Sequence, residues 1–166
     1  MKRIILFVCL AAALRMSGLL PFSGSDVAEL VPVEALTVDW KQGRVVLNGG
    51  SCQGYGEDWA AALEDLHRGA EGTVFLGTAE QVVLSEAAVK LLPDVIRSEE
   101  LRPAAVICVC DGHLPEPEDA ATYLSAHNAD MTIQKVQAAM VRGEGVALPV
   151  LRETEGGLRL YGSENR

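Results

Sequence analysis

The sequence contains few aromatic residues and few basic ones. Phe, Trp and Tyr make up 5% of its 166 residues, so a folded core must be built mainly from Val, Leu and Ala. The chain has 14 Lys and Arg against 23 Asp and Glu, a formal net charge of −9. Nucleic acids and anionic membrane surfaces are bound by clustered cations, and the body of the chain has no basic run. The composition therefore disfavours nucleic acid as a partner.

Cysteines are too few, and wrongly spaced, for a disulfide framework or a zinc site. Cys9 lies in an apolar N-terminal run, which leaves Cys52, Cys108 and Cys110, so one bridge plus a free thiol stays open. The last two belong to "AAVICVC", a run typical of a buried strand, where free cysteine packs as a small hydrophobe. The paired CxxC spacing of structural zinc is missing. We expect no metal site and no cofactor.

The sequence shows no motif for an active site. Ser85 lies in "VLSEA", without the flanking glycines that a strained nucleophile elbow requires. The pattern favours Ser85 as a helix cap, with Glu86 in the first turn. An enzyme acting through Ser85, Cys108 or Cys110 would need a histidine within hydrogen-bond reach. The three candidates lie at a predicted helix end or in or beside loops: His67, His113 and His127. We therefore expect a protein that is not an enzyme and assign no catalytic residue.

A glycine-rich segment, "NGGSCQGYGED" at residues 48–58, precedes a predicted helix. It contains no lysine, and Glu57 and Asp58 in the first helical turn would repel a phosphate. We predict a flexible connection here rather than a phosphate-binding loop.

The N-terminus has the pattern of an export signal. Lys2 and Arg3 precede an apolar run at residues 4–14, and small residues follow. The run is short for a membrane-spanning helix, and Arg15 interrupts it. We predict a signal peptide or membrane anchor at residues 1–25, followed by a single domain at residues 26–166.

Periodicity in this domain predicts strands alternating with helices. Expected strands are residues 31–40, 44–49, 73–77, 80–85, 104–110, 146–153 and 157–162, of which residues 80–85 could equally begin a helix. Expected helices are residues 57–69, 86–101 with a new start at Pro93, 118–128, and 133–143 capped by Thr132. The first and last strand pairs read as hairpins. We therefore expect an α/β (α+β) fold, with a mixed sheet, antiparallel hairpins at both ends and helices packed on it.

The order of these blocks resembles the N-terminal domain of the Ger(x)C family of spore germination lipoproteins, the C subunits of germinant receptors. The matching segments are "DVAELVPVEALTVDWKQG", "GEDWAAALEDL", "TVFLGTAEQVVLSEAAV", "LLPDVIRSEELRPAAVICVC" and the final block from "AATYLSAHN" to "GGLRLYG". The resemblance covers about residues 26 to 162. Ser23 or Gly24 stands where family members usually carry the cysteine that is lipidated, and the resemblance extends over the family's N-terminal domain, which would finish near "YGSENR".

The resemblance implies a non-enzymatic component of spore germination, acting through contacts with other germinant receptor subunits or membrane proteins. The implied location is the spore inner membrane or the outer face of the cell membrane, or outside the cell if the protein is secreted. The alternative is a secreted α/β module that binds a small ligand, in a pocket framed by the loops at residues 49–56 and 111–119.

Overall fold

The computed structural model describes residues 30–127 and 129–162. The signal or anchor predicted at residues 1–25 lies outside this part of the chain. The described strands are β1 (Leu30–Pro32), β2 (Ala35–Lys41), β3 (Arg44–Asn48), β4 (Gln53–Gly56), β5 (Thr73–Phe75), β6 (Gln81–Ser85), β7 (Val106–Asp111), β8 (Val150–Thr154) and β9 (Gly157–Tyr161). The helices are α2 (Trp59–Gly69), α3 (Leu92–Arg97), α4 (Pro117–Ala126) and α5 (Ile133–Val141), with short 3-10 turns η2 (Leu76–Thr78) and η3 (Glu86–Leu91).

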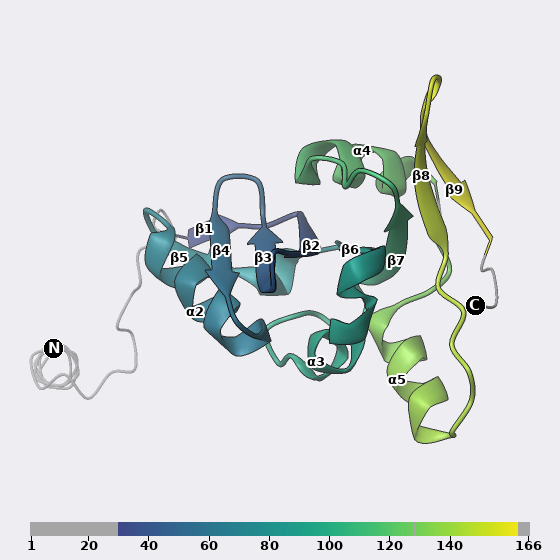
Figure 1. Cartoon of the computed structure of the whole chain (residues 1–166), viewed down its shortest axis with the longest axis horizontal. Coiled ribbons are helices and arrows are strands. Elements are labelled where there is room, and N and C mark those ends of the chain that lie inside the picture. The colour runs from purple at the N-terminus through teal and green to yellow at the C-terminus, as the bar shows by residue number, and fades with distance from the viewer. Residues whose placement is uncertain (1–29, 128, 163–166) are drawn as a thin grey trace, which may run out of the picture.

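Seven strands form one mixed sheet in the order β4-β3-β2-β6-β7-β8-β9. The central strands β2, β6, β7 and β8 are parallel, whereas β3 and β4 at one end, and β9 at the other, are antiparallel to their neighbours. Every residue of β6 is buried, as expected for a parallel strand covered on both faces. The predicted mixed α/β fold with a hairpin at each end is confirmed (Figure 1).

The strand predicted at residues 31–40 is two strands. β1 leaves the main sheet and pairs with β5 in a separate two-stranded parallel sheet. Pro32 cannot donate a ladder hydrogen bond, which confines its strand to an edge. At Glu34 the chain turns, and its carbonyl accepts the N–H groups of Glu80 and Gln81 at 2.8 and 3.4 Å. The prediction of one continuous strand was therefore wrong.

The glycine-rich segment is not a flexible loop, because it contains β4. Gly54 and Gly56 alternate along this edge strand and face helix α2. A Cβ atom on Gly54 would lie 2.2 Å from the carbonyl oxygen of Ala62, and one on Gly56 2.2 Å from the backbone nitrogen of Ala62. Only glycine lets the helix lie directly on the strand. Sequence reasoning missed this because repeated glycines also favour loops.

Side-chain caps begin three of the helical segments, two of them at predicted positions. The Ser85 hydroxyl accepts the N–H of Ala88 at 3.2 Å and starts η3, which confirms its capping role. Thr132 caps α5 in the same way, as predicted. Asp58 does not lie in the first turn of α2 as predicted but caps it, accepting the N–H of Ala61 at 2.8 Å.

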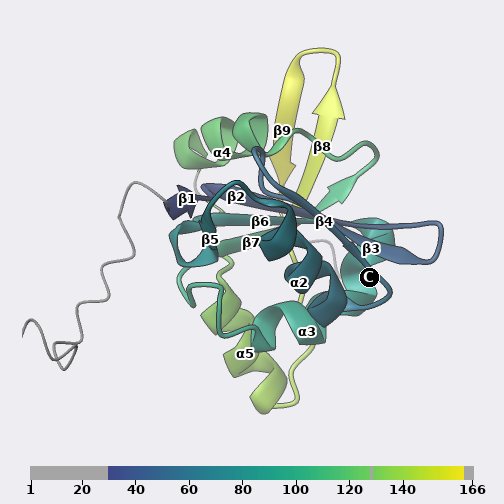
Figure 2. The same ribbon diagram turned by 90° about the vertical axis from the view of Figure 1, so that its left-hand side faces the viewer.

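The helices cover the two faces of the sheet unequally. Of the helices in residues 30–127 and 129–162, Figure 2 shows α2, α3 and α5 on one face and α4 on the other. We call the first the core face; its side chains form the larger apolar cluster and include Leu36, Val38 and Leu84. We call the second the α4 face; its smaller cluster includes Cys110 and Leu151.

Candidate functional site

The α4 face carries Ser85, Cys108 and Cys110, the candidate nucleophiles of the sequence, and also Asp39, which the sequence did not single out. In the sheet register Val38 pairs with Leu84, and Ser85 pairs with Cys110. Asp39, Ser85 and Cys110 therefore stand side by side at the carboxyl ends of three parallel strands. Ligands of open α/β sheets commonly bind near this edge, so these three residues are the first candidates for an active site.

Asp39 and Ser85 support each other structurally. Burial alone would raise the pKa of the Asp39 carboxyl, but hydrogen bonds from Lys41, from Ser85 and from the N–H of Trp40 outweigh it and leave the pKa lowered. The Lys41 ammonium lies 2.8 Å from the carboxylate. Asp39 therefore stays ionised, and the Ser85 oxygen is already engaged by Asp39 and by the cap.

Cys52, Cys108 and Cys110 are free thiols in the structure. Burial, and to a smaller extent the neighbouring Cys110, raises the pKa of Cys108 to about 12. Burial, and to a smaller extent Asp111 and other carboxylates, raises the pKa of Cys110 to about 11. The Cys110 thiol donates to the backbone carbonyl of His113 at 3.1 Å and not to its ring. Thiols with such pKa values are protonated at neutral pH and behave as core residues.

Two of the histidines are engaged away from these residues. His67 lies 2.6 Å from the Glu100 carboxylate, and His127 stacks on Tyr123 with ring centroids 4.1 Å apart. Within residues 30–127 and 129–162, no group of three His, Cys, Asp or Glu side chains is placed to hold a metal ion.

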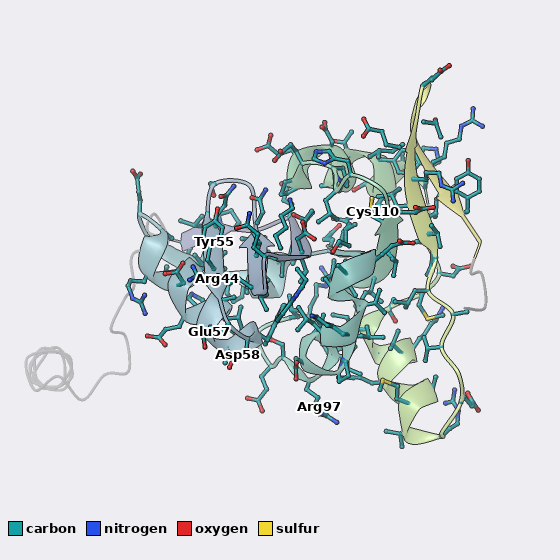
Figure 3. All side chains as sticks on the ribbon, viewed as in Figure 1. Arg44, Tyr55, Glu57, Asp58, Arg97 and Cys110 are labelled. Carbon is teal, nitrogen blue, oxygen red and sulfur yellow. The ribbon has the colours of Figure 1, made fainter. Side chains whose placement is uncertain are left out.

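A polar groove of about 740 Å³ lies on the α4 face of the β2–β4 hairpins. Alternate residues of the three strands make its floor, because Lys41 pairs with Arg44, and Val46 pairs with both Asp39 and Tyr55. Residues 113–116, just before α4, make its wall. Figure 3 marks Arg44 and Tyr55 on neighbouring strands. Both loops predicted to frame a pocket contribute to this groove, the first through β4.

Most charged side chains of the polar groove are already paired with neighbouring polar groups. Asp39 is paired with Lys41, and the Glu116 carboxylate accepts the Asn48 amide at 3.4 Å. Arg44 is exposed, and no carboxylate of the described residues lies within ion-pair distance of it. The polar groove therefore presents one cation next to the exposed ring of Tyr55.

A second, more apolar groove of about 580 Å³ separates α4 from the β8–β9 hairpin. We call it the α4–β9 groove. Its sides include Leu114, Tyr123, Ala126 and Leu158, and Glu116, Asp119 and Glu153 stand on its rim. The sequence did not predict this groove, because its walls come from segments about thirty residues apart. The only local signal was the alternation of Leu158 and Leu160 with polar residues.

None of the described helices has the length and apolar character needed to cross a membrane. Comparisons with protein-family models, with curated proteins and with solved structures found no match.

Proposed function

We infer that the protein is a non-enzymatic component of spore germination, exported or membrane-associated, that acts by contacting other receptor subunits or membrane proteins. The observation that carries this proposal is the order of sequence blocks that resembles the N-terminal domain of the Ger(x)C family. These blocks follow elements of the fold in order: "VEALTVDWKQG" contains β2, "GEDWAAALEDL" enters α2, and "EQVVLSEAAV" covers β6 and the start of η3.

The state of the polar side chains supports contacts rather than catalysis. The Ser85 hydroxyl accepts a capping N–H, and the Cys108 and Cys110 thiols are buried with raised pKa values. None of the three is activated as a nucleophile must be. The two grooves of the α4 face, by contrast, are open surfaces with mixed polar and apolar side chains, which suits a binding protein.

The test is deletion of the gene, followed by measurement of spore germination as the fall in optical density with each nutrient germinant. Slower germination with at least one germinant is expected, restored by the wild-type gene and equally by a Cys110→Ala allele. Normal responses to every germinant would remove the proposal. Loss of rescue by Cys110→Ala, with normal protein levels, would indicate thiol chemistry instead.

The polar groove favours a second candidate, a module that binds a small polar ligand. Arg44 and Tyr55 offer a cation and an aromatic ring, and Asp39 remains ionised beside them. Thermal-shift measurements with amino acids and sugars test this candidate. A ligand that raises the melting temperature of the wild type but not of an Arg44→Gln variant would support it, and a panel without any shift would count against it.

A further inference from the structure

We propose that the α4–β9 groove binds an extended segment of a partner protein, which adds to β9 as a further strand. The segment carries an apolar side chain flanked, two residues away, by a basic one. This inference rests on the proposed function as a contact protein, and it names the surface and the chemistry of the partner.

The outward edge of β9 has backbone groups that β8 does not use. Along β8 the backbone N–H and C=O groups of successive residues point alternately to β7 and to β9. The carbonyl of Pro149 accepts the N–H of Val109 in β7, so the backbone groups of the next residue, Val150, point to β9. Arg152 is two residues after Val150, so its backbone groups also point to β9, where they bond Arg159, its partner in the register. It follows that the N–H and C=O groups of Leu158 and Leu160 point away from β8.

One hydrogen bond agrees with this direction. The N–H of Leu160 donates to the Tyr123 hydroxyl of α4 at 2.9 Å. Within the described residues, no such partner is recorded for the outward N–H of Leu158. Strand addition at an exposed sheet edge, beside a helix, is an established mode of peptide recognition.

The opposite edge of the sheet is closed. Helix α2 lies against β4, and the Asp65 carboxylate accepts the outward N–H of Tyr55 at 3.0 Å. Such covering is how proteins prevent pairing at an edge strand. β9 is therefore the edge of the main sheet that offers backbone groups next to a groove, and Figure 2 shows its hairpin rising beside α4.

The lining of the groove specifies the apolar side chain. Side chains of an added strand alternate between the two faces of the sheet, so every second one faces α4. There it meets Leu114, Tyr123, Ala126 and Leu158. One apolar side chain in this position completes the half-buried cluster around Leu158 and Leu160.

The rim specifies the charge. Glu116, Asp119 and Glu153 are exposed around the groove, in a chain of net charge −9. Arg152 and Arg159 project from the other face of the hairpin, and Arg152 is bound to Asp111. A basic side chain on the α4 face of the added strand is therefore complementary. A second copy of this chain is not, because pairing of two β9 strands about their centres sets Arg159 opposite Arg159.

The probe is the peptide acetyl-Thr-Lys-Thr-Val-Thr-Lys-Thr-amide, titrated into the full ¹⁵N-labelled chain with amide shifts followed by NMR. Saturable shifts of β9 and α4 amides are expected. Leu158→Pro removes the outward N–H while leaving the β8 ladder intact, and should weaken binding about tenfold; Leu158→Val is its matched control. Tyr123→Phe releases the N–H of Leu160 and should tighten binding about threefold.

Two further probes keep the proposal falsifiable. A peptide with Glu in place of Lys should give no saturable shifts, and N-methylation of the three central residues should abolish binding even if Leu158→Pro fails to fold. Equal binding of the Glu peptide or the N-methylated peptide, or shifts confined to the polar groove, would overturn the proposal. A dimer seen by sedimentation that Leu158→Pro dissociates would replace the partner by a second copy.

The two proposals fail separately. Spores that germinate normally without the gene would remove the germination function, while Leu158-dependent peptide binding would still support the groove. A germination defect in the deletion strain, together with no peptide binding by the protein, would support the proposed function but exclude the α4–β9 groove as its contact site.

Discussion

The two faces of the sheet are made by the same strands but are covered very differently. Along β2, Leu36 and Val38 enter the core face, whereas Thr37 and Asp39 face α4. In the described part of the chain, α2, α3 and α5 close the core face over aliphatic side chains, and α4 leaves a groove on each side of itself on the other face. The core face therefore supplies most of the burial that stabilises the fold, and the α4 face carries the grooves on which the proposed binding rests.

The largest effect should come from opening the core face. Leu84→Ala removes a fully buried side chain and should lower the free energy of unfolding by about 2–5 kcal/mol. Leu114→Ala, at the half-buried wall of both grooves, should cost about 1 kcal/mol. Urea unfolding followed by circular dichroism measures both. Equal losses of unfolding free energy in the two variants would contradict the claim that the core face supplies most of the stability.

The next largest effect concerns the contact of α2 with β4. Gly54→Ala inserts a methyl group where backbone atoms leave no room, and should lower the free energy of unfolding by about 3 kcal/mol. Gly145→Ala is the control, because its new Cβ would meet no atom within 4 Å. A stable Gly54→Ala variant would mean that α2 does not lie on this strand.

A smaller, pH-dependent effect belongs to the α4 face. Because the folded-state pKa of Asp39 lies below its ordinary value of 3.8, the carboxylate adds stability at neutral pH that is lost as the pH falls through the folded pKa. Asp39→Asn should therefore cost about 1 kcal/mol at pH 7. The two unfolding free energies should converge below about pH 4. A difference independent of pH would exclude the ionised contact with Lys41 and Ser85.

The smallest effect should be a gain. The side-chain oxygen of Gln81 is buried beside α4 without a hydrogen-bond partner among the described residues. Gln81→Met replaces the amide with an apolar side chain of similar size. It should raise the free energy of unfolding by about 0.5 kcal/mol, measured as a higher melting temperature. Lower stability would show that the weak 3.4 Å bond from Gln81 to Ser125 holds α4 in place.

The sequence predicted the fold better than the site, for physical reasons. Local signals predicted the buried strand β7, the caps at Ser85 and Thr132, and the closing hairpin, whereas the segment of β6 was equally open to the start of a helix. The β4 strand was missed because its glycines are required by a helix that follows in the chain, and local propensity cannot register that contact. The α4–β9 groove was missed because it exists only where α4 meets a hairpin about thirty residues later.

Germination of spores carrying Leu158→Pro tests the central claim, that the α4 face is the working surface of a germination protein, most directly. With protein levels matched by immunoblot, these spores should lose optical density more slowly than spores carrying Leu158→Val, approaching the rate of the deletion strain. Parental rates in the Leu158→Pro spores, alongside a clear defect in the deletion strain, would contradict the claim.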